Sequence, residues 1–167
     1  MEYMQRELAE EIRTRLLQPG PDFNSKWANT TSRYVLPAGE ITDLVADPEG
    51  ARLLTAFEIF GESTVNCLTV DDLGSNEARQ AVIASVNEIN DWRWSVAPFD
   101  VVMTSDDLEA AVLLSVDEFI LVGGTREFVE TALGKPVDRA KADFATYAAE
   151  MAHASRHLPA LAEKYCG

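Results

Sequence analysis

The chain has 167 residues, 47% of them hydrophobic, and a formal net charge of −14. This charge opposes binding to the phosphate backbone of nucleic acids and to anionic lipid surfaces, so we expect neither as a partner. The length suits a single domain, which we place at residues 1–152, followed by a C-terminal tail at residues 153–167. No segment has the features of a signal peptide or a membrane span, which predicts a cytoplasmic protein.

The negative charge is concentrated in residues 40–130. This acidic block has nineteen carboxylates, four arginines and no lysine, and therefore a formal charge of −15. Both flanks are nearly balanced, with five acids and five bases before the block and four acids and five bases after it. A concentrated negative field raises the rate of encounter with basic proteins or peptides. The charge pattern therefore favours a protein or peptide partner of basic character.

In the first part of the chain we expect a helix, a loop and a strand. Apolar residues recur every four positions at Met4, Leu8, Ile12 and Leu16, and Pro19-Gly20 supplies a stop. Residues 19–31 have the composition of a turn-rich loop, and residues 32–36 that of a strand. Residues 38–50 are ambiguous.

Two apolar runs follow, at residues 53–60 and 64–70. Both are rich in β-branched, aromatic or aliphatic side chains, and Gly61-Glu62-Ser63 separates them. This pattern predicts a β-hairpin.

The next expected element is a helix over residues 76–90. Ser75 is a plausible N-cap, and Ala78, Val82, Val86 and Ile89 lie four, four and three residues apart. We then predict two strands, at residues 92–103 and 108–116, after which the apolar residues 119–122 lead into Gly123-Gly124. Finally, Thr125 is expected to cap a helix that ends at Gly134, and Pro136 to open another that extends toward His153.

This element order indicates the α+β class. Strands joined by short turns pair in the antiparallel sense, so we predict one twisted antiparallel sheet with helices mainly on one face. The residues predicted to share one interior are Val82, Val86, Ile89, Val112, Leu114, Phe128 and Phe144.

The most specific candidate for a metal site is Glu150, His153 and His157. The two histidines are four residues apart and Glu150 precedes the first by three, so one helix face would carry three possible ligands. The segment is polar and close to Pro159, where no buried surroundings are expected to exclude water. An exposed helix end is therefore the preferred interpretation, and no metal site is assigned.

Other short motifs predict no chemistry. The pairs Asp71-Asp72 and Asp106-Asp107 read as turns, because adjacent side chains point in different directions. Gly123-Gly124-Thr125 precedes a helix but lacks the lysine and longer glycine loop of a phosphate site. No catalytic residue, cofactor or nucleophile motif is recognised.

Asp91-Trp92-Arg93-Trp94 is the most unusual local cluster. On a strand both indoles would share one face, either in the core or at an exposed binding surface. With Asp100 nearby, carboxylates and large aromatic rings are adjacent here. The candidate partner-binding residues are Trp92, Trp94, Asp91 and Asp100.

The stretch from Ala81 to Leu133 resembles the YbjN family of bacterial proteins. The resemblance rests on VNEIND, on WRWSV and on DLEAAVLLSVDEFILVGGTREFVETAL. That family is itself similar to the class I chaperones of type III secretion. The resemblance implies a chaperone-like α+β fold, a homodimer, no cofactor, and a client polypeptide held along the sheet and helices.

These observations predict a non-enzymatic chaperone-like or adaptor protein that binds a polypeptide segment. The alternative is an immunity protein or inhibitor that covers the basic surface of a toxin or enzyme. A metal-dependent enzyme that uses Glu150, His153 and His157 is the third class considered.

Overall fold

The computed structural model describes residues 1–61, 63–116 and 118–167, and its centre is an antiparallel sheet. Among these residues the sheet has seven strands, in the order β1-β6-β5-β7-β8-β9-β4. The strands are β1 (Glu2–Tyr3), β4 (Tyr34–Gly39), β5 (Thr64–Thr69), β6 (Ala81–Ser85), β7 (Val101–Thr104), β8 (Ala111–Leu114) and β9 (Phe119–Gly124). A separate pair is formed by β2 (Leu17–Gln18) and β3 (Asp22–Phe23). The predicted α+β class with an antiparallel sheet is confirmed.

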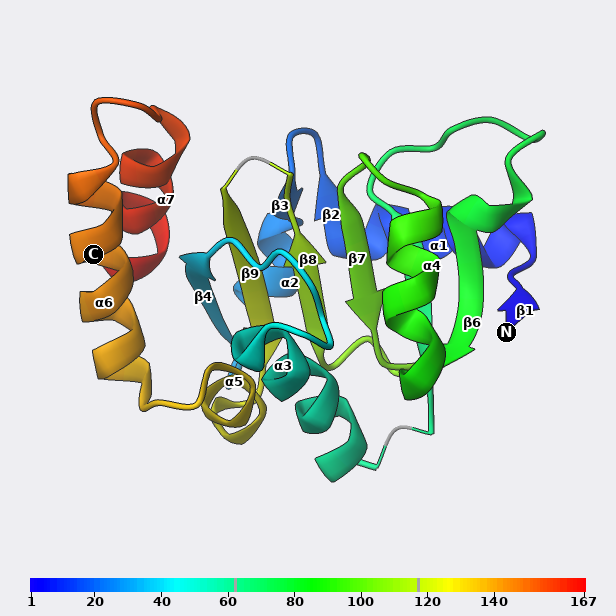
Figure 1. Ribbon diagram of the computed structural model, residues 1–167, viewed down its shortest axis with the longest axis horizontal. Coiled ribbons are helices and arrows are strands. Elements are labelled where there is room, and N and C mark those ends of the chain that lie inside the picture. The colour runs from blue at the N-terminus through cyan, green and yellow to red at the C-terminus, as the bar shows by residue number, and fades with distance from the viewer. Residues whose placement is uncertain (62, 117) are drawn as a thin grey trace.

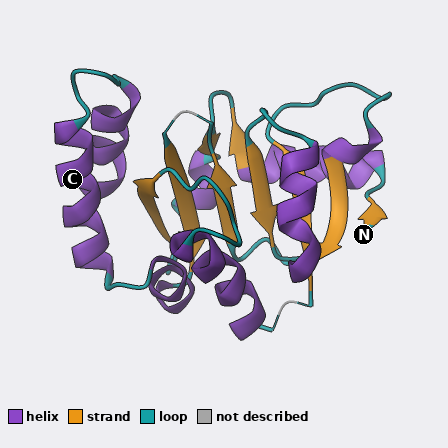
Figure 2. Ribbon diagram, viewed as in Figure 1, coloured by secondary structure: helices purple, strands orange, loops and turns teal. Residues whose placement is uncertain are grey.

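Helices surround this sheet (Figures 1 and 2). Those described are α1 (Arg6–Leu16), α2 (Ser25–Ala28), α3 (Pro48–Ile59), α4 (Ile89–Ser95), α5 (Arg126–Leu133), α6 (Val137–Glu150) and α7 (His157–Cys166). Short 3-10 turns flank β6 at Ala78–Gln80 and Val86–Glu88. Helices α3, α4 and α5 cover one face, α1 and α2 lie behind the other, and α6 and α7 stand beside β4.

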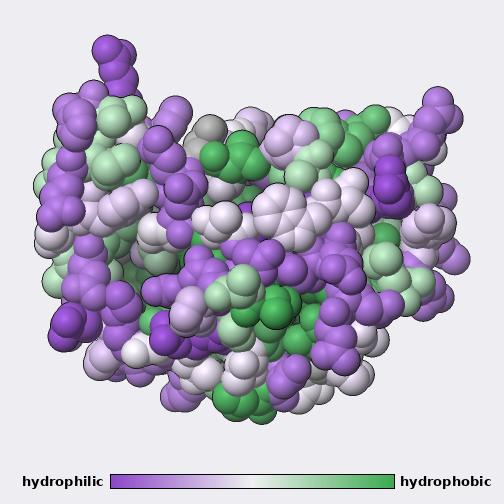
Figure 3. Space-filling model, viewed as in Figure 1, coloured by the Kyte–Doolittle hydropathy of each residue, from purple (hydrophilic) through white to green (hydrophobic). Residues whose placement is uncertain are grey.

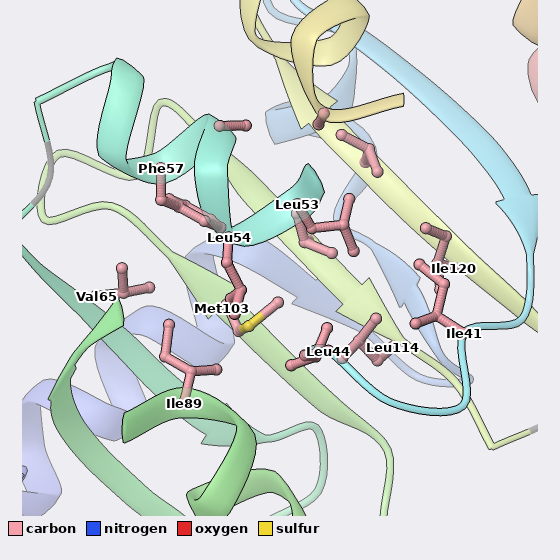
Figure 4. Packing of buried hydrophobic residues seen from close by; sticks show 14 of the residues in the cluster. Ile41, Leu44, Leu53, Leu54, Phe57, Val65, Ile89, Met103, Leu114 and Ile120 are labelled. Atoms are coloured by element: carbon pink, nitrogen blue, oxygen red, sulfur yellow. The ribbon is translucent and has the colours of Figure 1, made fainter. Parts of the chain in front are cut away.

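Each face of the sheet contributes to a different core. Along β8, Val112 and Leu114 belong to the cluster under α3, α4 and α5, whereas Ala111 and Leu113 belong to the cluster under α1 and α7. A strand covered on both faces is apolar at every position, so its sequence lacks the alternation of a half-exposed strand. Figure 4 shows the first cluster, where Leu53, Leu54 and Phe57 project from α3 toward the sheet.

The expected helix over residues 76–90 is wrong. Residues 81–85 form β6, residues 86–88 form a 3-10 turn, and an α-helix begins only at Ile89 of α4. The apolar spacing was misleading because Val82 on the strand, Val86 on the following turn and Ile89 on α4 all reach the same core cluster. Shared burial therefore produced a helical period across three different elements.

The expected hairpin of residues 53–60 with 64–70 is half wrong. The second run forms β5 as predicted, but the first lies in α3. Helix α3 begins where Asp47 accepts a hydrogen bond from the backbone N–H of Glu49, with Pro48 at the first helical position. Both are helix-start signals that outweigh the apolar run. The proposed turn includes Glu62, which lies outside the described residues.

The observed bounds of α5 agree with the capping residues predicted from the sequence. Thr125 caps α5 by accepting a hydrogen bond from the backbone N–H of Phe128 at 3.1 Å. Gly134 ends α5 in the left-handed conformation, with φ of 70°. Residues 157–166, expected as part of a tail, form α7, whose Leu158 is buried.

The predicted core residues are all buried, but they do not share one interior. Six belong to the cluster under α3, α4 and α5, whereas Phe144 on α6 belongs to the cluster on the opposite face.

Across the described ranges, none of the helices combines the length and apolarity needed to cross a bilayer.

Candidate functional site

The loop of residues 40–47 joins β4 to α3 and crosses one face of the sheet (Figure 1). Its Ile41 and Leu44 side chains are buried and point toward Ile120 and Leu114 of the sheet (Figure 4). Gly50 of α3 allows the loop to pack closely, because a Cβ at that position would lie 2.7 Å from the Cα of Leu44. The loop is therefore packed against the sheet through Ile41 and Leu44, and against α3 at Gly50.

Asp43 organises the exposed part of this loop. Its carboxylate accepts hydrogen bonds from the backbone N–H groups of Val45 at 2.8 Å and Ala46 at 2.7 Å, and from the indole Nε1 of Trp94 at 3.0 Å. The backbone hydrogen bonds from Ala46 and Val45, followed by that from Trp94, lower the pKa of Asp43 from 3.8 to about 2. Asp43 is thus a stable anion that ties the loop to α4.

Two further residues of α4 hold the loop. The guanidinium of Arg93 donates to the carbonyl oxygens of Thr42 and Ile41, each at 3.0 Å. Burial lowers the pKa of Arg93, and the nearby Asp43 carboxylate opposes that effect. The side chain of Asn90 accepts from the backbone N–H of Leu44 at 3.0 Å. Together with the bond from Trp94 to Asp43, these contacts bind four successive loop residues, 41–44, directly to α4.

The predicted strand over residues 92–103 is wrong at the tryptophans, which lie on α4. In a helix, residues two positions apart are separated by about 200°, so the two indoles point in opposite directions. Trp92 is only 1% exposed and donates Nε1–H to the carbonyl of Arg79 at 2.7 Å. Trp94 is 51% exposed. Only Trp94 of the pair is available to a partner.

The two candidate aspartates occupy different places. Asp91 is exposed on α4, three residues before Trp94, and so lies on the same side of the helix. Asp100 is partly buried, and its Oδ1 accepts a hydrogen bond from the backbone N–H of Val116 at 2.6 Å. Asp91 therefore joins Asp43 around Trp94, whereas Asp100 has a structural role between two loops.

Exposed apolar side chains accompany Trp94. Val45 follows the Asp43 turn, and its backbone shares the Asp43 carboxylate with the Trp94 indole. Phe99, just beyond α4, is half exposed. Figure 3 views this side of the molecule and shows apolar atoms among hydrophilic side chains.

A pocket of about 440 Å³ lies on the other side of the loop. Its apolar lining comes from β4, α3, α5 and the sheet, and includes Ala38, Ile41, Leu53, Ile120 and Leu133. Its charged lining residues are Glu40, Asp47, Glu49, Arg52 and Lys135. The pocket thus combines an apolar lining with several charged groups that can orient a bound group. We call the loop of residues 40–47, Trp94 and this pocket the loop surface.

The three residues of the candidate metal site do not lie on one helix. Glu150 ends α6, His153 lies in the following turn and His157 begins α7, and all three are exposed. Within the described ranges, no group of three or more histidine, cysteine, aspartate or glutamate side chains is placed to hold a metal ion.

The aspartate pairs and the Gly123-Gly124 motif have structural roles. Asp72 accepts from the N–H of Gly74 at 2.9 Å, and Asp107 from the N–H of Glu109 at 2.9 Å, as expected of turn residues. A Cβ at Gly123 would lie 2.7 Å from the ring of Trp27, so this glycine makes room for the indole.

The sequence interpretation missed the loop and its pocket. Residues 38–50 show no periodicity, and their functional arrangement depends on contacts with α4 that are distant in sequence. One local signal was available, because Asp47-Pro48 followed by Glu49 is a typical helix start and would have bounded the loop.

Comparisons with known proteins supply no relative. No protein-family model, curated protein or solved structure matches the chain.

Proposed function

We propose that this chain is a non-enzymatic chaperone-like or adaptor protein that binds a polypeptide segment at the loop surface. The observation that carries the proposal is Trp94, a half-exposed indole whose N–H is held by the Asp43 carboxylate. Tryptophan is enriched among the residues that dominate binding energy. An aromatic side chain already fixed in one orientation loses less conformational entropy when a partner binds.

The charge around Trp94 selects the kind of segment. Asp43 and Asp91 lie near the indole, and in the neighbouring pocket three acids, Glu40, Asp47 and Glu49, outnumber the two bases Arg52 and Lys135. A negative surface accelerates encounter with a basic partner, but affinity requires apolar contact as well. The expected client segment therefore combines basic residues with at least one large apolar side chain.

The pocket provides a second point of attachment. Its apolar lining suits one client side chain, and Glu40 or Glu49 at its rim suits a neighbouring lysine or arginine. Trp94 and the pocket lie on opposite sides of one loop. A client segment that crosses the loop would reach both, and so gain affinity from two contacts.

The wider assignment belongs to the same proposal. We propose a homodimer that works in the cytoplasm, and a relationship to the YbjN family and the secretion chaperones that it resembles. The two cysteines, Cys67 and Cys166, are free, which suits a reducing compartment.

The experiment is a binding screen with short synthetic peptides that vary independently in basic and apolar content. We expect selective binding of peptides that carry both features, with weaker binding at higher salt. In parallel, folded basic nucleases test the alternative of an immunity protein. Tight binding to a folded nuclease, without binding to any peptide, would replace the chaperone-like function with the inhibitory one.

A further inference from the structure

The pocket of the loop surface continues along the end of β4 into a second pocket. The second pocket has a volume of about 240 Å³ and lies between β4 and α6. The two pockets share four lining residues, which are Ala38, Gly39, Leu133 and Lys135. The second is completed by Pro37 of β4 and by four residues of α6, Ala140, Asp143, Phe144 and Tyr147. We call the two pockets together the edge groove, because β4 is the last strand of the sheet.

The backbone of Gly39 faces the edge groove and not the sheet. β4 is paired on one side only, with β9, and Gly39 lies opposite Phe119 in that pairing. The carbonyl of Phe119 accepts a hydrogen bond from the backbone N–H of Ser115, just beyond β8, at 3.1 Å. Backbone groups in an antiparallel ladder point alternately to the two neighbouring strands, so Phe119 faces β8 and exchanges no hydrogen bonds with Gly39. Gly39 therefore directs its N–H and its carbonyl toward the free side of β4.

Pro37 indicates the same backbone direction. It lies opposite Leu121, and a proline has no N–H to give to a partner strand. Prolines in sheets occur where the nitrogen faces away from the neighbouring strand. Since residues 37 and 39 are two positions apart, their backbones face the same side. The free side of β4 thus presents two carbonyl groups and one N–H at this point.

These backbone groups are available to a partner. Among the residues that the structure describes, no hydrogen bond involves the N–H or the carbonyl of Gly39, or the carbonyl of Pro37. Gly39 is partly exposed and lines both pockets. In Figure 1, β4 is the outermost strand on its side of the sheet, with α6 beside it. Unpaired backbone groups at the edge of a sheet are a template for another strand.

The charges of the edge groove favour a basic segment. Its acids are Glu40, Asp47, Glu49 and Asp143, and its bases are Arg52 and Lys135. Lys135 pairs with Asp143 at 2.7 Å, which leaves three carboxylates and one guanidinium. Much of the remaining lining is apolar. A polypeptide that carries a lysine or arginine beside an apolar residue complements both features.

We propose that the client segment binds in the edge groove as a short extended strand added to β4. Its backbone exchanges hydrogen bonds with Gly39 and donates to the carbonyl of Pro37. In strand addition the main chain supplies affinity, and the pockets for alternate side chains supply specificity. Every second client residue is then directed at the pocket of the loop surface, because side chains alternate between the two faces of a strand. This inference rests on the proposed function, since it specifies how the polypeptide is held.

The test is a backbone N-methyl scan of a peptide that binds the parent chain. A methyl group on an amide that faces β4 removes a hydrogen bond and occupies the space between the two strands. We expect the affinity, measured by fluorescence anisotropy, to fall about tenfold at alternate residues of the bound segment. The intervening amides point away from β4, so their methylation should have little effect and serves as the matched control within the same peptide.

Gly39→Pro tests the protein side of the same contact. The substitution removes the outward N–H and leaves the hydrogen bonds between β4 and β9 to the neighbouring residues. Peptide affinity should fall about fivefold, as expected for the loss of one hydrogen bond. Tyr3→Pro is the control on β1, the other edge strand. Met4 donates inward to the carbonyl of Ala81 at 3.0 Å, so the N–H of Tyr3 also faces outward, but outside the edge groove.

Tyr3→Pro should leave peptide affinity unchanged, and thermal unfolding checks that both variants are folded. A peptide that binds without the alternation, or a folded Gly39→Pro variant with unaltered affinity, would overturn strand addition and leave the proposed function in place. Failure of every peptide to bind the parent chain would refute the proposed function, and this inference with it.

Discussion

Trp94 and Asp43, 51 residues apart in sequence, are joined by a hydrogen bond of 3.0 Å from the indole Nε1 to the carboxylate. The bond links the last turn of α4 to the loop between β4 and α3. It leaves the indole half exposed while satisfying its polar N–H. The same carboxylate also accepts two backbone N–H groups, so the position of the ring and the shape of the loop depend on each other.

The two tryptophans of α4 should respond oppositely to truncation. Trp92→Ala removes a buried indole and should lower the free energy of unfolding by about 3–5 kcal/mol. Trp94→Ala removes an exposed ring and one hydrogen bond, so its cost should be about 1 kcal/mol. Urea unfolding measures both. Equal losses of stability would show that Trp94 is a core residue and not a binding residue.

Asp43 should make stability depend on acid pH. Its folded pKa, about 2, is lower than the 3.8 expected for an unperturbed carboxyl. The stabilisation is therefore fully present above pH 3.8 and is lost as pH falls toward 2. Asp43→Asn cannot titrate, so the stability difference between parent and variant should shrink over this range. A constant difference in urea unfolding at each pH would contradict the assigned hydrogen bonds.

Gly50→Ala should displace the loop. The added Cβ would meet the backbone of Leu44, which cannot move without disturbing the loop. We expect faster amide hydrogen exchange at Leu44 and Val45, together with weaker peptide binding. Gly61→Ala is the control, because a Cβ there meets no atom within 4 Å, although its φ of 88° adds local strain. Unchanged exchange in Gly50→Ala would show that the loop does not depend on this contact.

Metal chelation should leave folding and partner binding unchanged. Glu150, His153 and His157 are exposed and belong to three different contexts at the end of α6 and the start of α7. Elemental analysis of the purified protein, before and after EDTA treatment, measures any bound zinc. Stoichiometric zinc that disappears in His153→Ala would make these residues a metal site.

Local sequence signals predicted the elements that depend on few distant contacts. Thr125 and Gly134 bound α5 because a capping hydroxyl and a left-handed glycine act within one helical turn. The stripe Val137, Ala140, Phe144 and Ala148 is buried as a helical face should be. In these segments propensity, capping and burial indicate the same structure.

Strand β6 was mispredicted as part of a helix because the sheet is covered on both faces. Three of its five residues are buried and the other two are partly buried, so the strand lacks the alternation that distinguishes a strand from a helix. Strand β8 is also buried on both faces, but it lies within the strand predicted at residues 108–116. The position of Trp94 beside Asp43 depends on a contact between α4 and a loop far away in sequence. The candidate residue was therefore found in the sequence, but its binding surface was not.

The most direct test of the account is the affinity of a selected basic and apolar peptide for the parent chain and for Trp94→Ala. Phe60→Ala is the matched control, since Phe60 is an exposed aromatic residue at the end of α3. Fluorescence anisotropy of the labelled peptide should show a loss of at least about tenfold for Trp94→Ala, which is typical of an interface hot spot, and little change for Phe60→Ala. Unaltered affinity of a folded Trp94→Ala variant would contradict the assignment of the loop surface as the polypeptide-binding site.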